Sequence, residues 1–423
     1  DIKTFDQAYC DQIIKSIGSK KATVIAVDKV NKRTYSPRLY DLTELQRDAN
    51  KAFNFSAKET LSIMQRLYES HKVLTYPRTD SRYISTDIIE TLQERVDACR
   101  VGPYAKLANK LLQSPIKGNS RFVDNSKVSD HHAIIPTEES PDLRALSGKE
   151  RNIYDLVVRR FLAVLYPAFE YEQTTIQADI GGEFFSARGK RIIAQGWKEV
   201  YENKYDDEED VLEEQTLPVI VKGDVLTLSK VTKTTGKTRP PAPFNEATLL
   251  TAMESPAKYM AHKDQDLKRT IDETGGLGTV ATRADVIEKL FNTFLIEKRG
   301  KDIWVTSKGK QLLELVPEEL KSPALTAQWE QKLSAIAKGQ LKKDTFVKEM
   351  ETYAKAVVKE IKESKEKFKH DNMTTTRCPE CNKRMLEVNT QRGKMLVCQD
   401  RECGSRKTIS ITTNARCPQC RKR

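Results

Sequence analysis

The segment Val73–Ser81 constrains this chain most, because a proline separates a stretch that can be a strand from one that must turn. Its first four residues are apolar, β-branched or aromatic, which predicts a short buried strand. Pro77 lacks an amide hydrogen and favours extended geometry at the residue before it. The strand is therefore expected to end at Tyr76 and to open into a cleft, with Arg78 in the turn that follows.

The residue types in this turn suit phosphate chemistry. An arginine can bind a phosphate through two parallel hydrogen bonds. A tyrosine phenol titrates near pKa ~10, so it is a poor nucleophile at neutral pH. A fixed cation lowers the cost of the phenolate and also stabilises a phosphoryl transition state. The alternative is a packed core tyrosine followed by a surface turn, and the residues of this segment alone fit both interpretations.

A longer stretch around this turn resembles a known family. The run Ser56–Ser85 contains Gln-Arg-Leu-Tyr-Glu at 65–69 and Leu-Thr-Tyr-Pro-Arg-Thr-Asp-Ser at 74–81, and it closely resembles the active-site segment of type IA DNA topoisomerases. The Tyr-Pro-Arg form and the later His-His-Ala-Ile-Ile-Pro-Thr at 131–137 are most similar to bacterial topoisomerase III. The resemblance implies an ATP-independent isomerase that cuts one DNA strand through a 5′-phosphotyrosine, passes another strand and reseals the break. Relaxation of negative supercoils or decatenation would follow.

The resemblance also implies roles for individual residues. Tyr76 matches the nucleophile, Arg78 the phosphate-stabilising cation and His131 the contact to the scissile phosphate. Glu69 matches a residue that helps to orient the site. Further matched positions, taken as DNA contacts, are Gln65, Thr75, Thr79 and Asp80.

The two adjacent histidines have an alternative interpretation. Asp130, His131 and His132 precede a buried-looking Ala-Ile-Ile run, so they are expected on a loop that enters the core. A histidine there can donate to a phosphate oxygen or act as an acid near neutral pH. A structural histidine pair fits the same pattern. A zinc site is not expected, because neighbouring histidines with one aspartate lack convergent spacing.

A second motif lies in the later half of the chain. Residues 275–283, Gly-Gly-Leu-Gly-Thr-Val-Ala-Thr-Arg, precede a predicted helix at 284–291. A helix N-terminus with hydroxyl groups and an arginine can bind phosphate, although a lone Gly-rich turn is usually a plain loop. The run closely resembles the family's Gly-Leu-Gly-Thr-x-Ala-Thr-Arg motif, which implies single-stranded DNA binding through Thr279, Thr282 and Arg283.

The cysteine spacing predicts a metal site near the C-terminus. Two pairs, Cys378-x2-Cys381 and Cys398-x4-Cys403, have the spacing of a Zn²⁺-binding ribbon. Basic residues around them suit DNA-backbone contact, and a purely structural or protein-binding ribbon is the alternative. The last pair, Cys417 and Cys420, is interpreted as half of a truncated second ribbon that should not hold metal tightly alone. The basic residues are Arg377, Lys383, Arg384, Arg392, Lys394, Arg401, Arg406 and Lys407.

Composition agrees with a nucleic-acid partner. The net charge of +12 and the pI of about 9.1 favour a polyanion. No apolar run approaches the ~18 residues of a membrane span, and no signal peptide is evident. Clustered cysteines indicate metal ligation in a reducing cytosol. We expect a cytoplasmic, nucleoid-associated monomer that binds single-stranded DNA and no membrane; a helicase partner is left open.

Periodicity predicts the local structure. A hairpin is expected from 23–30 and 33–42, helices at 56–70, at 85–100 and from 147, and an antiparallel sheet within 168–232. The acidic run 206–210 is interpreted as a solvated loop. A Pro-rich linker at 234–243 precedes mostly helical sequence, including a predicted hairpin at 294–307. Two apolar stripes are expected to be core faces: Leu325, Trp329, Leu333 and Ile336, and then Phe346, Met350, Tyr353, Val357 and Ile361.

The predicted fold class is multidomain α+β: a toroidal type IA topoisomerase core of helical domains and a β-rich arch, with a C-terminal zinc ribbon. The parts implied by the resemblance are a first stretch of the arch (1–48), a helical domain with the tyrosine (49–165), a second stretch of the arch (166–245), a helical base with the Gly-rich motif (246–369) and the ribbons (370–423).

Family members begin with a Toprim domain that binds Mg²⁺ through an Asp-x-Asp cluster, and neither its start motif nor its cluster is found here. The chain is therefore expected to be a fragment that binds single strands and cleaves poorly or not at all by itself. The competing hypothesis is a non-catalytic single-stranded nucleic-acid-binding protein with a zinc ribbon. A tyrosine recombinase or relaxase would need an Arg/His constellation or a His-x-His cluster that is not seen.

Overall fold

The computed structural model describes residues 4–18, 21–202, 217–260, 265–364, 370–390, 393–400 and 402–411. The chain divides into two compact units, Asp1–Ala242 and Pro243–Arg423. The boundary lies in the predicted Pro-rich linker, and residues 234–243 are in neither helix nor strand. The finer division into five parts stays a prediction.

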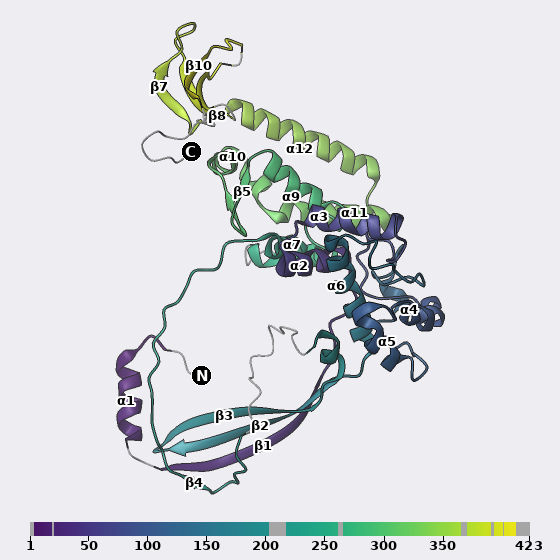
Figure 1. The fold of residues 1–423 in the computed structure, drawn as a ribbon. Coiled ribbons are helices and arrows are strands. Elements are labelled where there is room, and N and C mark those ends of the chain that lie inside the picture. Colours follow the sequence, from purple (N-terminus) through teal and green to yellow (C-terminus); the bar gives the residue numbers. More distant parts are fainter. Residues whose placement is uncertain are drawn as a thin grey trace, which may run out of the picture. The chain divides into compact units, whose positions relative to one another are not determined.

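A four-stranded antiparallel sheet forms one part of the first unit, with strand order β3-β2-β1-β4. Its three long strands lie side by side in Figure 1. Gly181 and Gly182 form the turn between β2 and β3, with φ of 68° and 93°, angles that glycine adopts without strain. The predicted antiparallel sheet within 168–232 is confirmed. The strands are β1 (Ala22–Thr34), β2 (Phe169–Ile180), β3 (Glu183–Ala194) and β4 (Val225–Leu226).

The predicted hairpin at 23–30 and 33–42 is wrong. Asn31 and Lys32, expected to form its turn, lie inside β1 and face Glu172 and Tyr171 of β2. An Asn-Lys pair lacks the glycine that favours a two-residue hairpin turn. The distant strand β2 instead pairs with β1 along nearly its whole length, from Thr23 to Thr34.

Helices form the rest of the first unit. Ser56 caps α3 by accepting a hydrogen bond from the Glu59 amide at 3.0 Å, and Ser147 and Glu150 form a complete capping box on α6. The helix predicted for 85–100 is a 3₁₀ turn followed by a short α-helix. The elements are α1 (Gln7–Ile17), α2 (Leu42–Phe53), α3 (Ala57–Glu69), η1 (Thr86–Thr91), α4 (Leu92–Ala98), η2 (Gly102–Tyr104), α5 (Ala105–Leu111), η3 (Asn125–Lys127), α6 (Gly148–Leu165) and η4 (Gly196–Tyr201).

Helix α6 forms the centre of this helical part. Ile153, Val157 and Phe161 of its predicted apolar face are buried. Arg160, 2% exposed, pairs with Asp48 of α2 at 2.7 Å and lies over the Tyr40 ring at 4.0 Å. The buried charge is thus compensated by a carboxylate and an aromatic face, which fixes α2 against α6.

The second unit is mainly helical. Its predicted hairpin is confirmed as β5 and β6, joined through Gly300 at φ 67°. A second four-stranded antiparallel sheet, in the order β10-β9-β8-β7, carries the cysteines. The elements are α7 (Glu246–Glu254), η5 (Pro256–Tyr259), α8 (Gln265–Glu273), α9 (Arg283–Asn292), β5 (Ile296–Arg299), β6 (Asp302–Val305), α10 (Ser307–Leu315), η6 (Glu318–Lys321), α11 (Pro323–Ala337), α12 (Lys343–Glu363), β7 (Met373–Arg377), β8 (Arg384–Thr390), β9 (Gly393–Cys398) and β10 (Arg406–Ile411).

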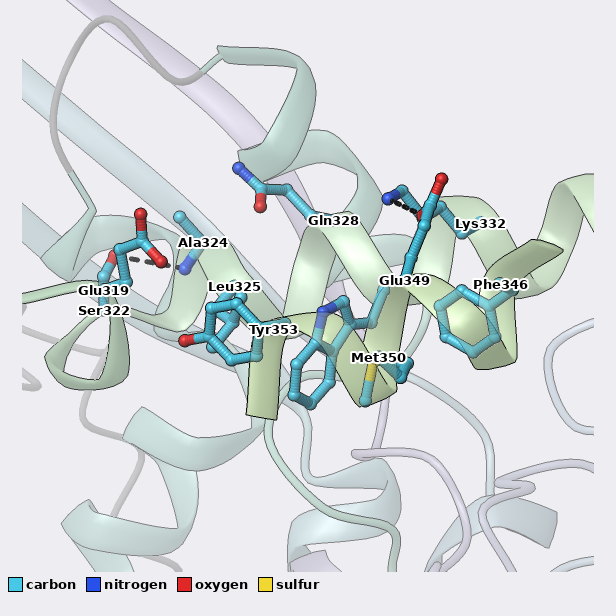
Figure 2. Close-up of a pocket in the computed structure, with 11 residues that line it drawn as sticks. Glu319, Ser322, Ala324, Leu325, Gln328, Lys332, Phe346, Glu349, Met350 and Tyr353 are labelled. Atoms are coloured by element: carbon cyan, nitrogen blue, oxygen red, sulfur yellow. Dashed lines mark hydrogen bonds and ion pairs between the residues drawn. The ribbon is translucent and has the colours of Figure 1, made fainter. Parts of the chain in front are cut away.

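The two apolar stripes face each other across α11 and α12, but they form only part of a core. The rings of Trp329 and Tyr353 meet edge to face with centroids 5.9 Å apart. Figure 2 shows Tyr353, Met350 and Phe346 among the residues that line a cavity of about 310 Å³, and Trp329 also belongs to this lining. Leu333 of the first stripe and Ile361, the last residue of the second, are each 44% exposed. The expected core faces are therefore only partly buried, and one residue of each stripe is exposed.

Candidate active site

The tyrosine segment pairs with the histidine segment, although about 60 residues separate them in the sequence. Leu74 forms a bridge with Pro136, and the Thr75 amide donates to the Ile135 carbonyl at 3.0 Å. The Thr137 amide donates to the Val73 carbonyl at 3.1 Å. The predicted strand is thus a short, buried, extended pair that ends before Pro77.

Tyr76 lies between two cavities and is half-buried. Its ring packs against His131 with centroids 4.3 Å apart, and Tyr68 meets it edge-on at 5.5 Å. One cavity of about 410 Å³ also has Asp130 and His131 in its wall, and the other, about 650 Å³, has Tyr68 and Glu69. Among the described residues, the Tyr76 hydroxyl has no hydrogen-bond partner. The phenol is therefore accessible to a ligand and is not sealed in the core.

Two predicted DNA contacts position the loop that carries His131. The buried Thr79 hydroxyl donates to the His131 carbonyl at 3.0 Å and accepts from the Ser81 amide at 3.1 Å. The Thr75 hydroxyl donates to the Ala133 carbonyl at 3.2 Å and accepts from the Ile135 amide at 3.0 Å. These hydroxyls hold the two segments together, and a contact of either threonine with DNA stays a prediction.

His132 and Arg95 complete the support of this loop. His132 Nδ1 lies 2.7 Å from the Ala133 carbonyl, so this nitrogen carries the proton and Nε2 is left as an acceptor. Burial lowers the pKa of His132, which favours the neutral ring. Arg95, 6% exposed, donates to the Pro136 carbonyl at 2.8 Å and pairs with Glu138 at 2.6 Å. Sequence reasoning missed Arg95, because a charged residue on a predicted helix is normally solvated.

The remaining predicted residues of this site differ in their placement. Glu69 is exposed at the end of α3 and lines the larger cavity beside Tyr76. Arg78 and Gln65 are half-buried, Asp80 is exposed, and none of the three lines either cavity. Within the described ranges, the side chains of these four residues make no hydrogen bond or ion pair, so their polar groups are free for a ligand.

The Gly-rich motif forms a tight loop before α9. The Leu277 amide donates to the Met253 carbonyl at 2.6 Å. Gly276 has φ of 84°, and a Cβ there would lie 2.1 Å from the Met253 oxygen, so only glycine fits. Thr279 and Thr282 are exposed, with hydroxyl oxygens 3.1 Å apart. Both hydroxyls lie just before α9, and the Thr282 hydroxyl accepts a hydrogen bond from the Thr279 amide at 2.9 Å.

Arg283 has a structural position within this loop. Its side chain is 2% exposed, Nε donates to the Leu277 carbonyl at 3.2 Å, and the guanidinium also bonds the Gly275 carbonyl. The arginine therefore braces the loop from inside. Its predicted contact with DNA is not tested by this geometry.

The four cysteines of the predicted ribbon converge. Their Sγ atoms all lie within 4.8 Å of one another, with 3.7 Å from Cys378 to Cys403 and 3.4 Å from Cys381 to Cys398. Zn–S bonds of about 2.3 Å in a tetrahedron put sulfurs ~3.8 Å apart, so the donor set fits zinc. Both sulfur separations are too long for disulfides, which need about 2.05 Å.

Two of the basic residues predicted around the ribbon form ion pairs, and several other predicted features lie outside the residues that the structure describes. Lys383 pairs with Asp400 at 2.5 Å and Lys394 with Glu387 at 2.8 Å, so these two charges are partly neutralised. The predicted features that lie outside the described residues are Arg392, Arg401, the half-site Cys417 and Cys420, and the acidic run 206–210.

Comparison with known proteins agrees with this geometry. The sequence model of a family described as DNA topoisomerase matches residues 1–348. The chain is 64% identical over 423 residues to DNA topoisomerase 3 of Bacillus anthracis and 59% identical over 422 residues to DNA topoisomerase 3 of Bacillus subtilis (strain 168). Each match covers 100% of this chain and 58% of the relative, so the chain spans little more than half the length of these curated relatives.

A solved structure shows the fold. Full-length topoisomerase I from Thermotoga maritima matches with a TM-score of 0.62 at 21% identity, over 97% of this chain and 64% of that one. The predicted fold class, a multidomain α+β topoisomerase fold, is confirmed by this likeness. In the part of the chain that the structure describes, no helix combines the length and apolarity needed to cross a membrane.

Proposed function

Because the chain belongs to the DNA topoisomerase family, we propose that it carries the cleavage tyrosine of a type IA, topoisomerase III-like enzyme acting on single-stranded DNA. The observation that carries the proposal is the placement of Tyr76, which is accessible, packs against His131 and lies between two cavities. The whole enzyme would relax negative supercoils or decatenate DNA as an ATP-independent isomerase.

The reaction exchanges one phosphate ester for another. The Tyr76 oxygen attacks phosphorus, the bond from phosphorus to the 3′-oxygen breaks, and the tyrosine is left on the 5′-phosphate. The phenol loses its proton and the 3′-oxygen gains one. In the reverse step the 3′-hydroxyl attacks the phosphotyrosine and restores the strand. Since the number of phosphate esters is unchanged, resealing needs no nucleotide energy source.

The surrounding side chains suit this exchange. His131 lies against the attacking ring, where a ring nitrogen can donate to a phosphate oxygen. Arg78, two residues after the nucleophile, supplies the cation that we assign to the transition-state charge. Glu69 faces the same cavity as Tyr76 and is assigned to orienting the site. Gln65, Asp80, Thr279 and Thr282 are assigned to DNA contact.

The proposal assigns Zn²⁺ to the four ribbon cysteines and Mg²⁺ to a domain outside this chain. When bound, Zn²⁺ would join the two cysteine knuckles and stabilise the β7–β10 sheet, which is too small to have a large core. In the family, Mg²⁺ is associated with the Toprim domain. Among the described residues, the cysteine set is the only group of three or more candidate metal ligands, so we assign no residue of this chain to Mg²⁺. We expect a nucleoid-associated monomer, and the proposal leaves a helicase partner open.

A covalent-adduct assay tests the proposal. The chain, with and without its upstream coding sequence, is incubated with a labelled single-stranded oligonucleotide and Mg²⁺ and then denatured. We expect a denaturation-resistant adduct from the longer protein that is lost in Tyr76→Phe. Tyr68→Phe is the matched control, because this tyrosine contacts Tyr76 and is 38% exposed. An adduct that persists in Tyr76→Phe refutes the assignment, and binding without any adduct favours the non-catalytic alternative.

A further inference from the structure

A further cavity in the first unit, with a polar wall, has no part in the proposed reaction. It has a volume of about 340 Å³, near the lower end of the range for small-ligand sites. Its wall contains three cationic and two aromatic side chains, and it shares no residue with the cavities around Tyr76. We call it the Tyr35 cavity, defined by Tyr35, Arg38, Tyr83, Arg121 and Lys127.

The charges in the Tyr35 cavity are poorly neutralised. Among the residues that the structure describes, neither Arg38 nor Arg121 pairs with a carboxylate through its guanidinium. Lys127 has one acidic neighbour, Asp124, at 3.5 Å. Three cations therefore face one carboxylate. Unpaired positive charge in a concave site attracts anions.

The aromatic rings order these cations. The Arg121 guanidinium lies 3.8 Å from the Tyr35 ring centroid and the Arg38 guanidinium 5.0 Å from that of Tyr83. Lys127 Nζ lies 4.6 Å from the Tyr83 centroid and donates to its hydroxyl at 3.2 Å. Cation–π contacts hold the charged groups in place without neutralising them.

The two tyrosines differ in exposure. Tyr83 is 5% exposed and serves as a support, whereas Tyr35 is 50% exposed and offers ring surface to a ligand. An open aromatic ring flanked by unpaired cations is the arrangement that binds single-stranded nucleic acid, with a base on the ring and phosphates on the cations. A duplex does not offer a free base face, so a single strand fits better.

The Tyr35 cavity is connected to the Tyr76 site through the backbone. The Ser81 hydroxyl donates to the Lys127 carbonyl at 2.7 Å, and the Ala133 amide donates to the Tyr83 carbonyl at 2.8 Å. The loop 119–132 contributes to the wall of both cavities. A ligand held by Arg121 and Lys127 would therefore contact the same loop that carries His131.

We propose that the Tyr35 cavity is a second binding site for single-stranded nucleic acid, which takes one base on Tyr35 and adjacent phosphates on Arg38 and Arg121. The inference rests on the proposed function for the identity of the strand. It concerns binding at residues that have no part in cleavage.

Fluorescence anisotropy with a labelled oligothymidylate, titrated at several salt concentrations, tests the site. All variants are made in the Tyr76→Phe background, so the result does not depend on whether Tyr76 is the nucleophile. Arg38→Ala with Arg121→Ala should weaken binding about tenfold near 0.15 M salt and reduce the salt slope by about 1.4. Tyr35→Ala should weaken binding about fivefold or more, and Tyr35→Phe should not.

Matched variants give the controls. Arg38→Lys with Arg121→Lys keeps the charges and should restore most of the affinity. Arg100→Ala with Arg144→Ala removes two exposed arginines outside the cavity and should change affinity less than twofold. If the cavity double variant matches this control in affinity and salt slope, the proposal is refuted.

Cross-linking and competition distinguish a nucleic-acid ligand from an acidic peptide. The cross-linking needs no substitution in the cavity, so it does not depend on whether a cavity variant folds. A 5-iodouracil oligonucleotide irradiated with the Tyr76→Phe chain should label the peptide that contains Tyr35, and absence of that label refutes the site. A polyglutamate peptide of equal charge is the competitor. If it displaces the oligonucleotide equally well and Tyr35→Ala has no effect, the cavity is an acidic-peptide site and the proposal fails.

Discussion

The Thr79 hydroxyl donates a hydrogen bond to the backbone carbonyl of His131 at 3.0 Å, and this bond ties the turn after Tyr76 to the loop that places His131 against the Tyr76 ring. Thr79 is 2% exposed, so its hydroxyl has no water to replace this partner. The buried Thr79 side chain thus joins the two motifs of the proposed site, in addition to the hydrogen bonds that Thr75 makes with Ala133 and Ile135.

Thr79→Val keeps the shape of the side chain and removes its hydroxyl. We expect a loss of about 1–3 kcal/mol in unfolding free energy, because the His131 carbonyl and the Ser81 amide lose their partner. Adduct formation should fall about tenfold while oligonucleotide affinity changes little. Urea unfolding and single-turnover cleavage measure the two effects, and Thr79→Ser should recover both. Unchanged cleavage in Thr79→Val would contradict a positioning role.

The capping box of α6 predicts a pH dependence. Hydrogen bonds from Arg66 and Ser147 lower the pKa of Glu150 to about 2. A carboxylate with a lowered folded-state pKa contributes stability that is complete above its unfolded pKa near ~4.3 and is lost as the pH falls towards 2. Glu150→Gln should therefore lower the free energy of unfolding by about 1–2 kcal/mol at pH 7. It should also reduce the loss of stability between about pH 4 and pH 2. Urea unfolding from pH 7 to 2.5 measures it, with the exposed Glu139→Gln as the control.

Gly276→Ala should destabilise the second unit more than Gly300→Ala. Both glycines have positive φ, which costs an alanine about 1 kcal/mol or more. At Gly300 a Cβ meets nothing within 4 Å, whereas at Gly276 it would lie 2.1 Å from a backbone oxygen. The loop must then shift, and we expect at least ~2 kcal/mol of additional loss together with weaker oligonucleotide binding. Thermal unfolding and anisotropy test this, and equal effects at the two positions would contradict the close packing of the motif.

Removal of zinc should unfold the β7–β10 sheet and leave the first unit folded. We expect one Zn²⁺ bound per chain and expect a chelator to remove it. Cys398→Ser should also prevent zinc binding, because three thiolates cannot close the tetrahedral site. Metal analysis and limited proteolysis of residues 370–411 are the measurements. Cys10→Ser, at an isolated and half-exposed cysteine, is the control. A metal content unaffected by Cys398→Ser would exclude this ligand set.

The sequence by itself determined where several strands and helices begin and end, because these features depend on residues that are close together in the chain. Pro77 ends the extended tyrosine segment, Ser147 and Glu150 begin α6, and the Gly181-Gly182 pair turns β2 into β3. The spacing of the ribbon cysteines likewise predicted which sulfurs meet. In each case the interaction spans a few residues or a recurring motif, so the chain itself carries the information.

Only the tertiary structure decided the features that join distant segments. Asn31 and Lys32 lie within β1 and do not form a turn, because β1 pairs with β2, which is about 140 residues later in the sequence. Thr79 and Arg95 have partners 52 and 41 residues away that no local pattern indicates. The Tyr35 cavity takes its cations from two segments, Arg38 from one and Arg121 and Lys127 from the loop 119–132. The physical reason is the same throughout: burial and hydrogen bonding are satisfied by whichever groups the completed fold brings together, and their separation along the chain does not limit that choice.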